Sequence, residues 1–243
     1  MKTVAALLVL ACAGVAVAGP VQTGNSGAGS ASFSAPRSVL WNQSTTNFNG
    51  VVDQDFPDFP TYSSGMVDDF TTSGQTWNVN RVTTYYTKGI GFWGTGIGSA
   101  QLSLYTKSAS MPGGADLVGN LGTVAATLIP LDNAWVLTAD TSGVGALQGI
   151  NGDFWVGLTP IAAFGVFGQE FHLLSSNATI GAGSAVRNIG GSFGFGTNWA
   201  DAGSLGSQPG ADMLFTLEGE VVPAPGAAAL LALGGVFAGR RRR

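Results

Sequence analysis

Cysteine is nearly absent from this sequence, and the one cysteine, Cys12, lies within the first 18 residues, which have the features of a removable leader. The chain that remains after its removal can form no disulfide. A chain without disulfides depends on a hydrophobic core for its stability. Residues 19–222 are numerous enough to enclose one core of substantial size.

Charged residues are also scarce, at 10% of the chain, whereas a typical globular protein has about 25%. Five of the 10 basic residues, Lys2 and Arg240 to Arg243, lie at the two ends, and all 14 acidic residues lie between them. The body therefore combines five basic with 14 acidic residues and carries a net charge of −9. Nucleic-acid binding is excluded, because it needs clustered Lys and Arg side chains that release counterions.

Aromatic residues, by contrast, are abundant. The 38 Gly and 10 Pro residues resemble the composition of a disordered chain. Six Trp, four Tyr and 14 Phe are, however, too many for a solvated coil. We expect a folded domain over residues 36–220 with a surface rich in hydroxyl and amide groups, preceded by a flexible leader over residues 19–35.

Apolar and polar residues alternate in several short segments, which predicts β-strands. In residues 101–105, for example, Leu102 and Leu104 share one face. Strands are expected at residues 66–71, 81–87, 101–105, 118–127, 134–139, 153–159, 169–175 and 212–218. Residues 200–210 are expected to form a loop, and no segment of the body has a sustained helical period. Many short strands at this spacing predict an all-β fold, an antiparallel β-sandwich.

Residues 1–18 have the three parts of a secretory signal peptide. Lys2 supplies the positive charge, residues 5–17 form an apolar segment, and Ala16 and Ala18 define a small-residue cleavage site. We expect signal peptidase to cut after Ala18. A lipoprotein signal ending at Cys12 remains an alternative, although it would shorten the apolar segment.

The C-terminus has a short apolar run between two prolines and a basic cluster. Residues 226–239 contain no polar side chain, so they cannot form a half-exposed surface helix. As a helix, at about 1.5 Å per residue, they reach about 21 Å, which is short of the roughly 30 Å hydrocarbon core. The four terminal arginines suit anionic headgroups on the cytoplasmic side. These features predict a short transmembrane helix that anchors the chain transiently, with a buried core helix as the alternative.

The tail, residues 221–243, resembles the PEP-CTERM sorting signal of exported bacterial proteins. Pro223 and Pro225 match the two prolines of that motif, and Ala224 stands where glutamate is usual. The basic end of the motif matches Arg240, Arg241, Arg242 and Arg243. The resemblance implies that an exosortase, a membrane-embedded enzyme similar to cysteine transpeptidases, recognises and removes the tail. It also implies a destination at the cell surface or outside the cell.

A second segment is similar to the opening strands of such exported proteins. Asp68-Asp69-Phe70-Thr71 is followed by Gly74-Gln75-Thr76-Trp77-Asn78-Val79 and a Val-rich strand. This resemblance implies a jelly-roll-like sandwich. It implies no activity.

Catalytic groups are sparse, and we expect no enzyme. His172 is the only histidine, so no multi-histidine metal site is expected. No serine is expected to stand in a Gly-x-Ser-x-Gly elbow, so no catalytic triad is expected, and a polar strand position is predicted for His172. A glycan hydrolase needs two carboxylates about 5 to 9.5 Å apart, and no Glu-x-Asp-x-Glu strand provides them. Carboxylates that converge from distant strands keep a hydrolase as a third hypothesis.

One acidic turn is a candidate site for a structural calcium ion. Asp53, Asp55 and Asp58 offer the oxygen ligands that a hard cation prefers. Phe56 and Pro57 interrupt the ligand spacing, so a solvated acidic loop is the alternative.

Three tryptophans are candidates for binding carbohydrate. Trp41, Trp93 and Trp199 lie in stretches rich in Gly or Asn rather than in alternating strands. Aromatic side chains in loops can stack on sugar rings, and the alternative is that they anchor loops over the sheet ends. The sequence therefore predicts an exported, non-catalytic protein of the cell surface or extracellular matrix. A module that binds exopolysaccharide is the second hypothesis.

Overall fold

The computed structural model describes residues 37–44, 50–88, 96–112, 119–131, 134–174, 180–205 and 209–223. Outside the described residues lie the predicted cleavage site at Ala16 and Ala18, the flexible leader predicted at residues 19–35, Trp93, and the tail from Ala224 to Arg243. The chain divides into residues 1–35 and 36–243, and all described residues belong to the second unit. Within the described ranges, no helix is long and apolar enough to cross a membrane.

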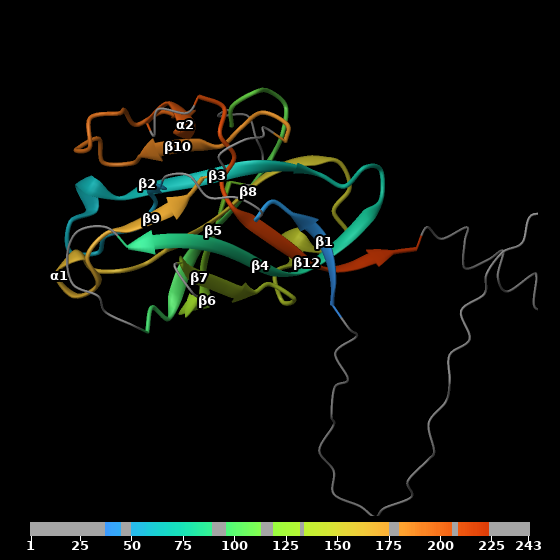
Figure 1. The fold of residues 1–243 in the computed structure, drawn as a ribbon. Coiled ribbons are helices and arrows are strands. Elements are labelled where there is room, and N and C mark those ends of the chain that lie inside the picture. Colours follow the sequence, from blue (N-terminus) through green and yellow to red (C-terminus); the bar gives the residue numbers. More distant parts are fainter. Residues whose placement is uncertain are drawn as a thin grey trace, which may run out of the picture. The chain divides into compact units, whose positions relative to one another are not determined.

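The described secondary structure is mostly β, with very little helix (Figure 1). The strands in chain order are β1 (Ser38–Asn42), β2 (Gly50–Val52), β3 (Ser64–Thr71), β4 (Thr76–Lys88), β5 (Ser99–Thr106), β6 (Gly119–Leu131), β7 (Ala134–Asp140), β8 (Asp153–Pro160), β9 (Glu170–Leu173), β10 (Ala185–Asn188), β11 (Ala200–Asp201) and β12 (Phe215–Val222). The helices are single turns: η1 (Pro60–Tyr62), η2 (Gly145–Leu147), α1 (Phe164–Phe167) and α2 (Ala202–Leu205).

The strands form one large antiparallel sheet in the order β1-β12-β4-β7-β6-β5-β8-β3-β10-β11. Strand β9 pairs with the end of β4, and β2 pairs with β9. The expectation of an all-β, antiparallel chain is therefore confirmed. Most of the predicted strands also lie within observed ones, because alternating residues place one apolar face of each strand against the core.

Strand β6 joins the two halves of this sheet. Its residues 119–125 pair with β5, whereas residues 126–131 pair with β7. The register with β5 shifts between Leu102 and Ser103, and Gly122 of β6 at this point has a φ of 92° that favours glycine. Such a bulge bends and twists a strand, which lets β6 pass from one half of the sheet to the other.

The sheet folds over so that one of its faces encloses the core. Strands β7, β6 and β5 separate β4 from β8 in the sheet order. Nevertheless, the Tyr86 hydroxyl of β4 lies 2.6 Å from the carbonyl oxygen of Leu158 in β8. Buried side chains of both strands, such as Val82 and Val156, belong to one hydrophobic cluster. Each large apolar side chain buried there stabilises the fold by about 1.5 to 3 kcal/mol.

The start of the last strand differs from the prediction. Strand β12 begins at Phe215 rather than at Asp212. Met213 forms a bridge with Leu174, and the Leu214 N–H donates to the Leu173 carbonyl. Residues 213 and 214 therefore extend the pairing beside β9 before the chain enters β12.

Two stretches taken as loops contain regular structure. The predicted loop at residues 200–210 holds β11 and α2, since the Asp201 carboxylate accepts hydrogen bonds from the Gly203 N–H and the Ser204 hydroxyl at the start of the helix. Trp41 lies in β1, which pairs with β12 and has a register shift between Val39 and Trp41. This irregular register explains why β1 gives no clean alternation in the sequence.

Candidate functional site

The only histidine lies in a fully buried polar network. His172 of β9 and Asp53, which follows β2, are both 0% exposed. His172 Nδ1 lies 2.9 Å from Asp53 Oδ2, and Nε2 lies 3.0 Å from the carbonyl oxygen of Leu214. Both ring nitrogens therefore have oxygen partners within the core. His172 therefore belongs to the core and does not reach an external substrate.

Asp53 is the centre of this network. Besides His172, its Oδ2 lies 2.8 Å from the Tyr86 hydroxyl. Its Oδ1 accepts hydrogen bonds from the Thr159 hydroxyl at 2.7 Å and from the Met66 N–H at 3.1 Å. A buried carboxylate needs such donors to replace its lost hydration. The first of the predicted calcium ligands thus links β3, β4, β8 and β9.

The other two predicted calcium ligands have different partners. Asp55 accepts a hydrogen bond from the Ser63 hydroxyl at 2.9 Å, and Asp58 accepts from the N–H groups of Phe164 and Gly165, each at 2.9 Å. Burial raises the pKa of Asp58, the two N–H groups lower it, and the net effect is a lowered pKa. Asp53, Asp55 and Asp58 share none of these partners. Across the described ranges, no group of three His, Cys, Asp or Glu side chains could hold a metal ion.

A second group of carboxylates does converge from separate segments. Asp68 of β3 and Asp212, before β12, are both 0% exposed. Burial and the nearby charge of Asp212 hold the pKa of Asp68 well above its usual range, and burial raises the pKa of Asp212 to about 6. Raised carboxyl pKa values also occur in hydrolase sites. A glycan, however, cannot reach enclosed carboxyl groups, so this pair does not supply the carboxylates that a glycan hydrolase needs.

Ser192 also lacks a catalytic environment. Residues 190–194, Gly-Gly-Ser-Phe-Gly, fit the letters of the Gly-x-Ser-x-Gly nucleophile elbow, so the expectation that no serine stands in this pattern is wrong at the level of the sequence. That elbow joins a strand to a helix, whereas residues 190–194 lie in the connection from β10 to β11. A Cβ added to Gly190 would lie 2.2 Å from the Thr61 Cα. The glycine pattern therefore permits close packing of two loops.

The predicted sugar-binding tryptophans lie in different environments. Trp41 packs against the main core, with its ring centroid 6.4 Å from that of Phe70. Trp199 packs against a smaller cluster, where the Arg187 guanidinium lies 4.6 Å from its ring centroid and the Tyr105 ring meets it edge-on at 5.8 Å. Trp41 thus acts as an anchor in the core, and Trp199 remains a candidate for ligand contact.

Trp199 borders a hollow that we call the polar groove. The groove has a volume of about 80 Å³, and its wall includes Asp55, Gln101, Ser103 and Arg187. These side chains offer carboxylate, amide, hydroxyl and guanidinium groups beside an aromatic ring. Such groups can hydrogen-bond to sugar hydroxyls and pack against a sugar ring.

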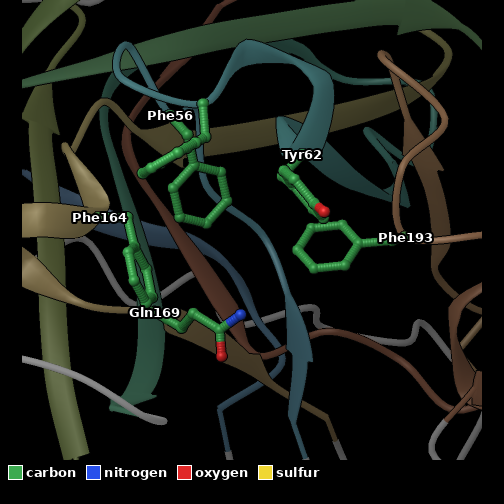
Figure 2. Close-up of a pocket in the computed structure, with 6 residues that line it drawn as sticks. Phe56, Tyr62, Phe164, Gln169 and Phe193 are labelled. Carbon is green, nitrogen blue, oxygen red and sulfur yellow. The ribbon is translucent and has the colours of Figure 1, made fainter.

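A larger hollow, the aromatic pocket, has a volume of about 210 Å³. Its described wall consists of five aromatic side chains and one amide: Phe56, Phe59, Tyr62, Phe164, Phe193 and Gln169. The wall residues come from the connection between β2 and β3, from α1 and the segment before β9, and from the connection between β10 and β11. Figure 2 shows the Phe164 ring on one side, the Tyr62 and Phe193 rings on the other, and the Gln169 amide at the lower edge between them.

The residues of this pocket follow no common motif, so the pocket cannot be predicted from the sequence. The one local indication of the pocket is a cluster of Phe and Tyr at residues 56–62. In the predicted calcium turn, Phe56 is interpreted only as a residue that interrupts the spacing of the aspartates. A scan against protein-family models and searches among curated proteins and solved structures found no match.

Proposed function

We propose that this protein is exported with two removable ends and serves at the cell surface or in the extracellular matrix as a non-catalytic structural protein. The observation that carries this proposal is the order of Pro223-Ala224-Pro225, the apolar run 226–239 and the terminal arginines, in a chain that starts with a signal-like segment. This order favours signal peptidase and an exosortase-like enzyme as processing partners. Association with the membrane is then transient.

The buried titratable groups support a non-catalytic role. A catalytic acid or base must come within hydrogen-bond distance of its substrate. His172, Asp53, Asp68 and Asp212 are each 0% exposed, and the first two bond to each other. These groups therefore act on the fold rather than on a substrate.

The finer fold that we propose is a jelly-roll-like β-sandwich. Strand β6 pairs with β5 along one part and with β7 along the other. Contacts such as Tyr86 to Leu158 join strands that are not neighbours in the sheet order. Both features fit two layers of one sheet packed face to face.

Cell fractionation tests the proposed sorting. The wild-type chain is expected in the envelope and the medium without its tail. A variant with Arg240, Arg241, Arg242 and Arg243 changed to Ser is expected to keep its tail, because the charge block that holds the segment in the membrane is lost. The matched control changes Arg81 and Arg187 to Ser, which removes basic charge from the body alone. Full-length wild-type chain that is soluble in the cytosol would contradict the proposal.

Binding of exopolysaccharide is the second candidate function, and the polar groove favours it. Trp199→Ala and Gln101→Ala are expected to lower retention on the exopolysaccharide of the source cells several-fold, because each removes a ring or hydrogen-bonding contact. Ile129→Ala is the control, since this 52% exposed residue of β6 lies away from the groove wall. If Trp199→Ala, Gln101→Ala and Trp93→Ala are all retained as strongly as the control Ile129→Ala, sugar stacking is excluded.

A further inference from the structure

The aromatic pocket exposes apolar side chains that the core could otherwise have enclosed. Phe59 is 49% exposed and Tyr62 is 42% exposed, although both stand beside the buried Phe56. Phe59 meets the Phe164 ring edge-on, with the centroids 6.1 Å apart, and Tyr62 meets Phe193 in the same way at 5.2 Å. The rings thus pack against each other around an open space rather than filling it. Clusters of exposed apolar side chains occur at binding sites more often than on the rest of a protein surface.

Three polar side chains outside the wall hold the pocket in shape. Gln54, which is 0% exposed, donates from Nε2 to the carbonyl oxygens of Ala162 at 2.7 Å and Gly168 at 3.0 Å, and so fixes both ends of the α1 segment. The Asp58 carboxylate accepts the N–H groups of Phe164 and Gly165 at the start of α1.

Asn188 fixes the opposite wall. It is 0% exposed, and its Nδ2 donates to the carbonyl oxygens of Ser63 at 2.9 Å and Thr61 at 3.2 Å, while its Oδ1 accepts the Phe193 N–H at 2.7 Å. Each connection that lines the pocket is therefore fixed by a side chain that does not line it. A wall ordered before the ligand arrives loses little entropy on binding.

The chemistry of the wall selects the kind of ligand. None of the described wall residues is charged, so a charged ligand would lose its hydration without a counter-ion. Gln169 makes no hydrogen bond with any described residue, and its amide can both donate and accept. The volume of about 210 Å³ is somewhat larger than the roughly 150 Å³ apolar cavity that holds one benzene molecule. We propose that the aromatic pocket binds a neutral small molecule with one aromatic ring and one hydrogen-bonding substituent, which faces Gln169.

Calorimetry and ligand-observed NMR test this proposal with 4-methylphenol and its isostere p-xylene. The sample is the protein purified from cells that express the full-length gene. 4-Methylphenol is expected to bind saturably with a dissociation constant on the order of 0.1 to 1 mM, which suits a ligand of about eight non-hydrogen atoms. Gln169→Met is expected to weaken the binding of 4-methylphenol about five- to tenfold and to leave the binding of p-xylene unchanged, because only 4-methylphenol has a hydroxyl that loses a hydrogen bond. Unchanged binding of p-xylene also shows that the variant is folded.

Wall and neighbour variants complete the test. Phe193→Ala is expected to weaken both ligands, whereas Val166→Ala, a 56% exposed neighbour in α1 that is not part of the wall, is expected to change neither. Hexanol and methyl α-glucoside serve as alkyl-chain and sugar probes. Tighter binding of either probe than of 4-methylphenol would overturn the proposal. So would dimerisation that blocks the binding of 4-methylphenol and that Phe193→Ala abolishes, because it would assign the pocket to a second copy of the chain.

Discussion

The two buried carboxyl groups Asp53 and Asp68 are both 0% exposed, yet their surroundings differ in kind. Asp53 has donors on both oxygens, including the ring of His172 and the hydroxyl of Thr159. Asp68 also has donors on both oxygens, from Gln43 and the Met213 N–H on Oδ2 and from the Asp69 N–H on Oδ1, but the neighbouring carboxyl groups include Asp212. At the first site, hydroxyl, ring and N–H groups bond to Asp53. At the second, burial and the charge of Asp212 raise the pKa of Asp68, which favours the neutral acid.

The next residue along β3 shows a third arrangement. Asp69 is 5% exposed, and its carboxylate pairs with Lys107 and accepts the Ala182 N–H at 2.8 Å. Asp68 and Asp69 point to opposite faces of the strand, so adjacent residues have unlike partners. Buried carboxyl groups in this protein therefore have different partners even at adjacent positions of one strand.

Replacing Asp53 is expected to have the largest effect. Asp53→Ala leaves the Met66 N–H, the Thr159 hydroxyl and one ring nitrogen of His172 without their partner inside the core. Each buried polar group left unsatisfied costs about 1 to 3 kcal/mol, so a total loss of about 3 to 5 kcal/mol is expected. Urea denaturation should show this loss in the free energy of unfolding. A loss below about 1 kcal/mol would contradict the assigned role of Asp53.

A matched pair of amide substitutions sharpens the comparison. Asp53→Asn places two new N–H donors against existing donors, and is expected to cost about 3 kcal/mol. Asp68→Asn imitates the neutral acid that its raised pKa favours. It keeps an oxygen for Gln43 and the Met213 N–H and loses only the bond from the Asp69 N–H, so it is expected to cost about 1 kcal/mol. The two variants are compared at pH 7 by the same denaturation assay. Equal costs would contradict the proposed difference between the surroundings of Asp53 and Asp68.

The sequence predicts the strands better than it predicts these sites. Alternation gives the apolar face of a strand such as β5, and it also places Asp68 and Asp69 on opposite faces. It cannot show that residues 53 and 172 meet, because their hydrogen bond depends on how the sheet folds over. The sequence analysis accordingly assigns Asp53 to a calcium turn, and it does not anticipate the aromatic pocket, whose wall comes from three connections.

The pH dependence of stability tests the second carboxyl site. The pKa of Asp212 is raised from 3.8 to about 6 by burial, so the folded chain holds this proton more tightly than the unfolded chain. Its stabilising contribution is full below about pH 4 and is lost as the pH rises through about 6. The free energy of unfolding is therefore expected to be about 2 kcal/mol higher at pH 4.5 than at pH 7.5 from this group. Asp212→Asn should remove that difference, and an unchanged pH profile in the variant would refute the assignment.

The smallest expected effect concerns a carboxylate with the opposite shift. Hydrogen bonds from Ser142 and the nearby Arg37 lower the pKa of Asp140 to about 2. Its contribution is present above pH 3.8 and is lost as the pH falls through about 2. The side chain is 56% exposed, so solvent screening limits the cost of Asp140→Asn at pH 7 to less than about 0.5 kcal/mol. Thermal denaturation at pH 7 and pH 2 should give a smaller difference for the variant than for the wild type, and a larger one would be incompatible with this shift.

The account as a whole depends on processing at both ends of an exported, non-catalytic chain. Intact-mass and terminal-peptide mass spectrometry of the protein recovered from its own cells tests this most directly. The account predicts a chain that starts at Gly19 and lacks Arg240 to Arg243. A recovered chain that still carries Met1 and the four terminal arginines would contradict it.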